Sequence, residues 1–125
     1  MTQIVIISHS KAIAAGTKDL LKQMAPGVTV IDQGGVGDDI GTSYDHIQAL
    51  INQVDDDTLC FYDIGSAEMN LDLAIEMYEG QHRVEKVDAP IVEGSFTAAV
   101  KLSVGGSIDE TIEAVSYTHL RAHET

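Results

Sequence analysis

A histidine between two serines follows an apolar run near the start of the chain, in the stretch IVIISHS at residues 4–10. An imidazole is largely neutral near pH 7 and offers a nucleophilic nitrogen, whereas a lysine amine is protonated at that pH. A strand that ends near Ser8 would hold His9 on rigid backbone with its ring facing solvent. We therefore interpret His9 as a candidate nucleophile; the alternative is a histidine with only a packing or surface role.

A long glycine-rich loop offers groups that bind an anion. Residues 32–42, DQGGVGDDIGT, lead into Ser43 and form an unusually long connection between a strand and a helix. Gly41 would let the backbone approach a ligand closely, while the hydroxyls of Thr42 and Ser43 could donate to its oxygens. Helix N-termini add unpaired amides that attract anions, so these groups together suit a phosphoryl group. The alternative interpretation is a flexible connection with an ordinary serine cap.

A carboxylate follows another apolar run, in the stretch TLCFYDIGSA. Asp63 could accept a hydrogen bond from one ring nitrogen of His9 and so set its tautomer and orientation, as carboxylates do for other histidines. It could also stabilise the turn with Gly65, and the two roles are compatible. Ser66 is expected to cap the helix that follows. Glu93, in VEGS, is interpreted as a helix-start carboxylate without a chemical role.

Four apolar runs alternate with helical patterns and would position these groups. The expected strands are residues 4–7, 28–31, 58–62 and 83–87. The last of them is more polar and is expected near an edge of the sheet. The expected helix caps are Ser10, Ser43 and Ser66, together with a capping box of Ser107 and Glu110 before the final helix.

The alternation predicts an α/β fold: an open, mainly parallel sheet of about four strands with helices on both faces, in three layers α/β/α. Residues 1–115 would form this domain. In such a sheet ligands bind outside the carboxyl ends of the strands, so the four loops that follow the strands should share one edge. Apolar spacing also predicts which residues the first helix turns toward the core: Ile13, Thr17, Leu20, Leu21 and Met24.

The charge balance limits the classes of partner. Seven Lys and Arg residues against 20 Asp and Glu residues give a formal net charge of −13. Such a charge repels phosphate backbones and anionic membranes and favours a basic protein partner, so neither nucleic acid nor a membrane is expected as a ligand. No apolar run approaches the length of a membrane span and no signal-peptide pattern precedes the first strand, so a cytoplasmic location is expected.

Other reactive residues lack chemical partners in the sequence. Cys60 lies in an apolar run and is expected to be a small buried hydrophobe. His119 and His123 have helical spacing but no third ligand, so no metal site is expected. His46 and His82 are interpreted as solvated surface. The chain has neither G-x-G-x-x-G nor a P-loop sequence, so it is not expected to bind a nucleotide by itself.

Four stretches together resemble a known family: IVIISHS, GGVGDDIGTS, DIGSAEMN and APIVEGSFTAAV, in this order and over nearly all of 1–115. They are similar to the mannose-type EIIA family and, within it, to the phosphotransfer subunits of bacterial dihydroxyacetone kinases that use phosphoenolpyruvate. The resemblance implies that His9 is the phosphoryl acceptor, through a tele-phosphohistidine intermediate. It also implies a set of residues that orient His9 or bind the phosphoryl group: Ser10, Gly41, Thr42, Ser43, Asp63, Gly65 and Ser66.

The resemblance also implies partners. The phosphocarrier HPr would donate the phosphoryl group, and ADP bound on the nucleotide-binding subunit of the kinase would accept it and then phosphorylate dihydroxyacetone. ADP, ATP and Mg would therefore belong to the partner subunit, with no cofactor on this chain, and the chain would form a homodimer. Some members carry further phosphocarrier domains after this one; the chain is too short for them and would be of the single-domain type.

Two alternatives stay open. The chain could be the EIIA of a mannose-type sugar transporter, although those proteins typically carry a GGSP-like turn where this chain has DIGSA. It could also be a non-catalytic regulator of the same fold that acts by docking. The last ten residues, SYTHLRAHET at 116–125, match nothing that the resemblance leads us to expect and look like translated adapter sequence. We interpret them as an atypical tail whose native origin is left open.

Overall fold

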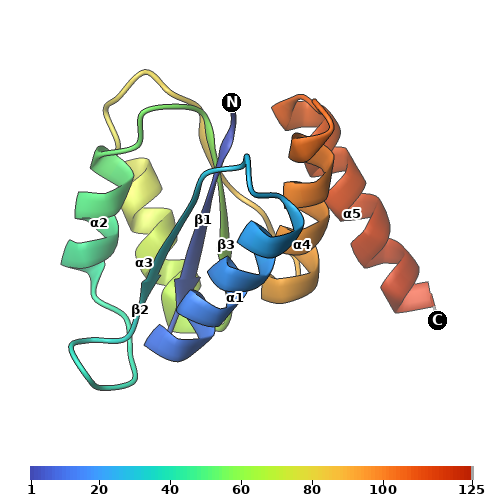
Figure 1. Ribbon diagram of the computed structural model, residues 1–125. Coiled ribbons are helices and arrows are strands. Elements are labelled where there is room, and N and C mark those ends of the chain that lie inside the picture. The colour runs from blue at the N-terminus through green and yellow to red at the C-terminus, as the bar shows by residue number, and fades with distance from the viewer. Residues whose placement is uncertain (125) are drawn as a thin grey trace.

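Strands and helices alternate along most of the chain in this computed structural model, which describes the backbone of residues 1–124 and the side chains of residues 1–117. The elements are β1 (Gln3–Ser8), α1 (Lys11–Met24), β2 (Val30–Gly34), α2 (Tyr44–Asn52), β3 (Thr58–Tyr62), α3 (Gly65–Glu76), β4 (Val84–Lys86), α4 (Ile91–Ser103) and α5 (Ile108–Glu124) (Figure 1). This order confirms the predicted α/β class.

The sheet is parallel throughout its four strands, with the order β2-β1-β3-β4. Side chains of β1 alternate between the two faces, so Ile4 and Ile6 pack with α1, α4 and α5 while Val5 and Ile7 pack with α2 and α3. Figure 1 shows the same division of helices between the two faces. The predicted three-layer architecture is therefore confirmed.

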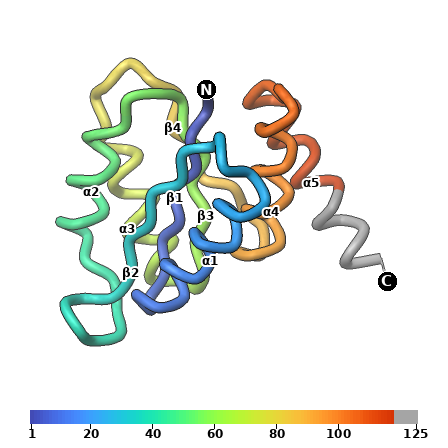
Figure 2. The backbone as a smooth tube through the Cα atoms, viewed as in Figure 1, coloured from blue at the N-terminus to red at the C-terminus, as the bar shows by residue number. Residues whose placement is uncertain are grey.

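The carboxyl ends of the strands share one edge, as expected for parallel pairing. β1 is a central strand and is buried over its whole length, so the residue after it starts from the most rigid part of the sheet. The turn after β1 and the loop between β2 and α2 lie at the same end of the molecule (Figure 2). β4 is short and lies at an edge, in agreement with its polar sequence.

β2 begins two residues later than predicted and extends further, to Gly34. Pairing with β1 decides this, because the register runs from Ile4 opposite Val30 to Ser8 opposite Gly34. The polar residues Asp32 and Gln33 fit in this strand because it lies at the other edge of the sheet and is only partly buried.

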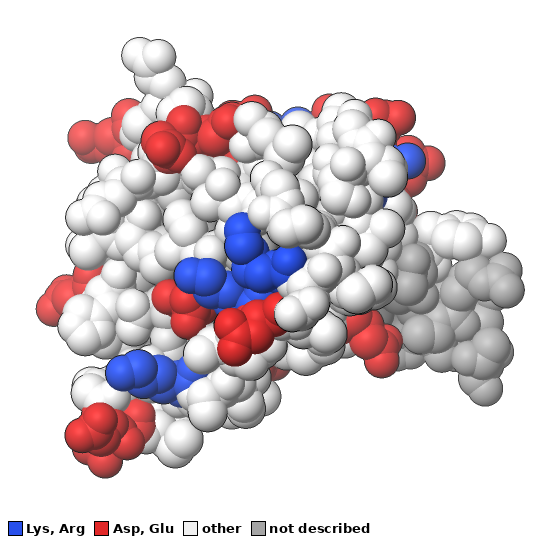
Figure 3. All heavy atoms as spheres, in the orientation of Figure 1, with Lys and Arg blue, Asp and Glu red and all other residues white. Residues whose placement is uncertain are grey.

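The buried face of α1 is also corrected by the structure. Thr17 and Leu21 are buried as predicted, but Ala14 completes the face, and Ile13, Leu20 and Met24 are exposed. Small Ala14 lets the helix lie against the sheet, which leaves the larger apolar side chains on the outside. In Figure 3, Lys and Arg residues (blue) cluster on the surface at the position of this helix, between Asp and Glu residues (red).

The last helix begins as predicted. The amide N–H of Ser107 donates to Oε1 of Glu110 at 2.9 Å, and the Glu110 amide donates to Oγ of Ser107 at 3.1 Å, which forms the capping box. The α5 backbone continues to Glu124. His119 and His123 lie outside the residues whose side chains are described. Within the described part of the chain, every helix is too short or too polar to span a bilayer.

Candidate functional site

His9 lies directly after the central strand β1, and its neighbour Ser8 connects it to β3. The register of β1 and β3 pairs Ile7 with Tyr62, which brings Ser8 beside Asp63. The Ser8 hydroxyl, fully buried, donates to Oδ2 of Asp63 at 2.6 Å and accepts from the Ser10 amide at 3.0 Å. The two strand ends are thus joined at the point where the candidate nucleophile emerges.

Asp63 holds His9 through both backbone and ring. Its Oδ2 accepts from the His9 amide at 3.0 Å, and its Oδ1 lies 3.0 Å from Nδ1 of the His9 ring. An ionised carboxylate can only accept, so Nδ1 carries a proton, and in the neutral ring the lone pair lies on Nε2. Oδ1 also accepts from the Ile64 amide at 2.8 Å, so the predicted contact of Asp63 with the ring is present, while its contact within the turn is with Ile64 rather than with Gly65.

Burial would raise the pKa of the Asp63 carboxyl, but the hydrogen bonds from Ser8 and His9 outweigh it and hold this pKa below its ordinary value. Asp63 is therefore ionised throughout the neutral range. The His9 side chain is 13% exposed and that of Asp63 is 15% exposed, so the ring is held tightly but one side remains open to a partner.

Ser66 reaches the other side of the ring, where its hydroxyl contacts Nε2 of His9. It is not the N-cap of α3, and this prediction is wrong: the helix begins at Gly65, with Ile64 in extended conformation as its N-cap and no side-chain capping bond. Asp63 accepts from the Ile64 amide, and the helix starts two residues earlier than predicted. The first amides of α3 therefore remain without a side-chain cap, directly beside His9.

The loop between β2 and α2 is fastened to the same place. The Gly41 amide donates to the carbonyl oxygen of His9 at 2.8 Å, and the Gly35 amide donates to that of Ser8 at 3.3 Å. Gly41 has φ 144°, a conformation that favours glycine. Ser43 caps α2, since its hydroxyl accepts from the His46 amide at 3.3 Å. The serine cap of the alternative interpretation is thus present, and the loop is in addition bonded to the backbone of Ser8 and His9.

Thr42 is connected to α3 by a residue that sequence reasoning missed. Nδ2 of Asn70 donates to Oγ1 of Thr42 at 2.8 Å. Asn70 follows Ser66 by four residues, so the two side chains lie on one face of α3, one turn apart. That spacing is the signal that could have identified Asn70.

The remaining predicted residues have local roles. Ser10 caps α1 through the Ile13 amide at 3.2 Å, as predicted. Gly65 is the first residue of α3, and Glu93 is exposed in the first turn of α4, in keeping with its interpretation as a helix-start carboxylate. Cys60 is fully buried, and burial raises the pKa of its thiol.

A polar cluster beside the site was also missed. The Tyr62 hydroxyl lies 2.7 Å from Oδ1 of Asp88 and 3.0 Å from Oε2 of Glu68, and Lys86 donates to that Glu68 oxygen at 2.7 Å. Burial and the two carboxylates raise the pKa of Tyr62. The cluster joins β3, β4 and α3 immediately before Asp63, and so it supports the turn that holds His9.

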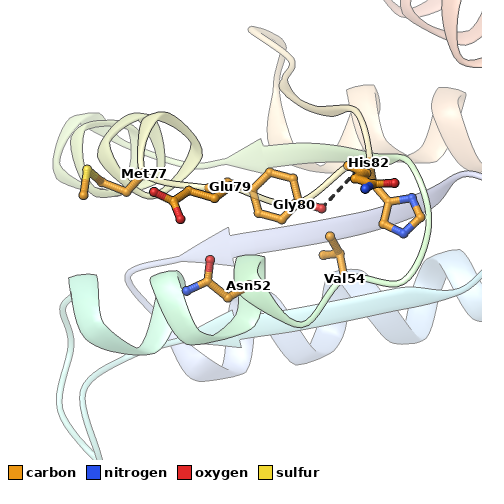
Figure 4. A pocket seen from close by; sticks show the side chains of 8 residues that line it. Asn52, Val54, Met77, Glu79, Gly80 and His82 are labelled. Atoms are coloured by element: carbon orange, nitrogen blue, oxygen red, sulfur yellow. Dashed lines mark hydrogen bonds between the residues drawn. The ribbon is translucent and has the colours of Figure 1, made fainter.

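A hollow of about 550 Å³ lies at the opposite end of the molecule, between the C-terminal ends of α2 and α3. Figure 4 shows Asn52 and Val54 on one side of it and Met77, Glu79 and His82 on the other. His82 is exposed, as is His46, in agreement with their interpretation as surface residues. This hollow shares no residue with the surroundings of His9.

Near that end, Asp56, Asp57 and His82 bring potential metal-ligand atoms within 4.8 Å of one another. Asp56 pairs with the N-terminal amine at 2.7 Å, and Asp57 accepts from the Arg83 amide at 2.8 Å. None of these three residues is among the described residues that contact His9.

Comparison with known proteins agrees with this geometry. The sequence model of the mannose-type EIIA family, described as the fructose IIA component of the phosphotransferase system, matches residues 3–112. A solved structure of a protein of unknown function superimposes with a TM-score of 0.81 and 31% identity, and the match covers 93% of each chain.

Two curated relatives are similar over most of their length. The phosphotransferase subunit DhaM of the PTS-dependent dihydroxyacetone kinase of Lactococcus lactis is 39% identical over 108 residues, which cover 85% of this chain and 86% of that protein. The phosphoryl donor subunit DhaM of kinase 1 of Listeria innocua is 37% identical over 115 residues, which cover 90% of this chain and 88% of that protein. The chain therefore belongs to the mannose-type EIIA family of phosphotransferase-system components, in the branch of the DhaM subunits.

Proposed function

We propose that this chain is the phosphohistidine relay subunit of a dihydroxyacetone kinase that uses phosphoenolpyruvate. His9 accepts a phosphoryl group from HPr and passes it to ADP on the nucleotide-binding subunit of the kinase, which then phosphorylates dihydroxyacetone. The observation that carries the proposal is the contact between Asp63 and Nδ1 of His9, at 3.0 Å, because it leaves Nε2 as the nucleophilic atom. The DhaM names of the relatives support the acceptor.

The transfer needs no proton to leave the ring. Nε2 attacks the phosphorus of the donor phosphohistidine, the new N–P bond forms as the old one breaks, and the bonding electron pair returns to the donor imidazole. Nδ1 keeps its proton, so the phosphorylated ring of His9 carries a positive charge that the Asp63 carboxylate stabilises. When a terminal oxygen of ADP takes the phosphoryl group, the Nε2 lone pair is restored.

Groups around Nε2 fit the oxygens of the transferred group. The uncapped N-terminus of α3 presents the amides of Gly65 and Ser66, and the positive end of the helix dipole favours an anion there. The hydroxyls of Ser66 and Thr42 are further donors. Positioning and fixed dipoles supply most of the catalysis in phosphoryl transfer, so no cofactor is assigned to this chain, and ADP and Mg belong to the partner subunit.

The surface around His9 suits the docking of proteins. Ile40, Ile64 and Met69 are 75%, 61% and 73% exposed, respectively, and lie next to Gly41, next to Asp63 and three residues after Ser66. Such apolar side chains within an acidic chain of net charge −13 fit donor and acceptor proteins that bring an apolar patch bordered by basic residues. The two partners would use this surface in turn.

The proposal is tested by incubating the chain with phosphoenolpyruvate, enzyme I and HPr, followed by intact mass measurement and peptide mapping. One acid-labile phosphoryl group on His9 is expected. His9→Ala should take none, while the matched control His82→Ala, at the opposite end of the molecule, should be labelled fully. No label on the folded unaltered chain, with active donors, would refute the proposal.

The acceptor is tested in a second step. The phosphorylated chain is mixed either with the ADP-loaded kinase subunit or with the B domain of a mannose-type transporter. Loss of label with formation of ATP in the first mixture is expected. Transfer to the B domain alone would assign the chain to sugar transport instead.

A further inference from the structure

We propose that Asn70 is a positioning residue for phosphoryl transfer, which holds the Thr42 hydroxyl so that its hydrogen points toward the phosphoryl group on His9. This role rests on the proposed function, since it requires His9 to carry that group. In this role Asn70 contacts neither the ring of His9 nor the transferred group, and it acts only through Thr42.

The placement of Thr42 follows from two anchors. On one side, its neighbour Gly41 donates its amide to the His9 carbonyl oxygen at 2.8 Å. On the other, Nδ2 of Asn70 donates to its Oγ1 at 2.8 Å, across 28 residues of sequence. Asn70 lies one turn of α3 after Ser66, whose hydroxyl contacts Nε2 of His9. Thr42 therefore lies against α3, one turn after the residue whose hydroxyl contacts the reacting nitrogen.

The direction of the hydroxyl hydrogen follows from the type of donor at position 70. A hydroxyl has one hydrogen to donate and two lone pairs that accept. Because the Asn70 amide fills one lone pair, the hydrogen of Thr42 does not point at Asn70 and needs another acceptor. A phosphoryl oxygen on Nε2 supplies it, and charged acceptors form the stronger hydrogen bonds.

The same contact adds a side-chain bond to a loop that is otherwise held through its backbone. Gly35, Gly37 and Gly41 have φ values of 72°, 60° and 144°, and Val36 and Asp39 exchange two backbone hydrogen bonds at 2.9 and 3.0 Å. The Asn70–Thr42 bond ties the end of this loop to α3. Without it, Thr42 would be held only through its neighbour Gly41 and the start of α2.

The decisive variant is Asn70→Asp. A carboxylate of nearly the same shape cannot donate to Thr42; it would accept the hydroxyl hydrogen and place a negative charge near the phosphoryl group. Asn70→Ala removes the bond without this reversal. We therefore expect the rate of His9 phosphorylation by phosphorylated HPr to fall about 3- to 10-fold in Asn70→Ala and further in Asn70→Asp.

A double-mutant cycle shows whether Asn70 acts through Thr42. Thr42→Val should slow phosphorylation about as much as Asn70→Ala, and adding Asn70→Ala to Thr42→Val should cause no further loss. Thr42→Ser keeps the hydroxyl and should retain most of the rate that Thr42→Val loses. This comparison tests the role of the hydroxyl while Asn70 is unchanged. Asn52→Asp is the matched control, because Asn52 is exposed at the far end of α2 and should leave the rate unchanged.

The outcomes distinguish a failure of the positioning role of Asn70 from a failure of the proposed relay function. If the unaltered chain is phosphorylated but Asn70→Asp is no slower than Asn70→Ala, or the losses at positions 42 and 70 add, the positioning role is overturned alone. If phosphorylation of Thr42→Ser is as slow as that of Thr42→Val, the positioning role is overturned as well. Absence of phosphorylation in the unaltered chain would overturn the proposed function and this role together.

Discussion

The N-termini of α2 and α3 lie at the same edge of the sheet but are capped differently. At α2 the hydroxyl of Ser43 accepts from the His46 amide at 3.3 Å, and Ser10 caps α1 in the same way. At α3 the N-cap residue is Ile64, which has no side-chain bond to the helix. A side chain thus accepts from one of the first amides of α1 and of α2, whereas no side chain caps α3, whose first amides bind the phosphoryl group in the proposed function.

The difference concerns the surroundings of His9. Among α1, α2 and α3, the helix without a side-chain cap is the one whose first turn contacts His9, through Ser66; α4, which follows Pro90, also starts without a side-chain cap. Asp63 makes this arrangement possible, since its carboxylate takes the Ile64 amide at 2.8 Å and orients the ring with the same oxygen. One carboxylate oxygen thus contacts both the turn before α3 and the ring of the candidate nucleophile.

The largest effect is expected from Asp63→Asn. The carboxylate accepts from the Ser8 hydroxyl, from both the amide and ring of His9, and from the Ile64 amide, and a side-chain amide with one oxygen cannot accept all four. Phosphorylation of His9 should slow by about 10- to 100-fold, the usual loss when a carboxylate that orients a histidine is removed. Stopped-flow transfer from phosphorylated HPr would measure it. A rate within a factor of two of the unaltered chain would show that the ring is oriented by other groups.

Removal of one open amide should have a smaller effect. Gly65 is the first helical residue of α3, where proline is well tolerated, and Ile64 already has the extended conformation that proline requires before it. Gly65→Pro deletes the amide hydrogen and should slow phosphorylation about 2- to 5-fold at nearly unchanged stability.

The matched control is Gly65→Ala, which keeps the amide and whose added Cβ meets no atom within 4 Å. It should be phosphorylated at the normal rate. Equal rates for Gly65→Pro and Gly65→Ala would mean that the amide of residue 65 does not contact the phosphoryl group.

Substitutions of Ser43 at the start of α2 and of Ser66 at the start of α3 should have different effects on stability and on phosphoryl transfer. Ser43→Ala removes a cap and should lower the free energy of unfolding by about 1 kcal/mol. Ser66→Ala removes no cap and should change it by less than about 0.5 kcal/mol, while slowing phosphorylation. Urea denaturation and the transfer assay measure the two effects. A larger loss of stability in Ser66→Ala than in Ser43→Ala would reverse the comparison.

The smallest effect is a pH dependence of stability. Because the pKa of Asp63 is lower in the folded chain than its ordinary value of 3.8, its ionised form stabilises the fold above that pH, and this contribution is lost as the pH falls through the lowered pKa. The difference in unfolding free energy between the unaltered chain and Asp63→Asn should therefore shrink at the acid end of a urea denaturation series. A difference that grows toward low pH would contradict the direction of the shift.

Features that depend on neighbouring residues were predictable from sequence. Ser10, Ser43 and the pair Ser107 and Glu110 cap helices as expected, because a cap is a contact between residues three positions apart. Ser66 has the same local signal and fails as a cap, because Asp63, which takes the Ile64 amide, moves the helix start. A local signal cannot reveal which of two neighbouring polar residues the folded turn will use.

Features that depend on packing were harder to predict. The apolar spacing of α1 fits two faces about equally, and only the approach of Ala14 to the sheet selects the one that leaves Ile13 and Leu20 exposed. The four-residue spacing of Ser66 and Asn70 indicates a shared helix face, but the partner of Asn70, Thr42, lies 28 positions away, and no spacing rule indicates that contact. The ends of β2 were set in the same way, by the register with β1.

The sequence by itself determined the class of fold and the edge at which the candidate site lies, because alternating strands and helices of this kind leave the ends of parallel strands on one side, and it indicated His9 as the candidate nucleophile. Tertiary structure alone decided the tautomer of His9, the open start of α3 and the hold of Asn70 on Thr42. The first and the last of these rest on hydrogen bonds between segments far apart in the chain, whose partners are chosen by strand register and helix packing, which no single segment encodes. The start of α3 depends on which of several neighbouring polar residues the folded turn uses.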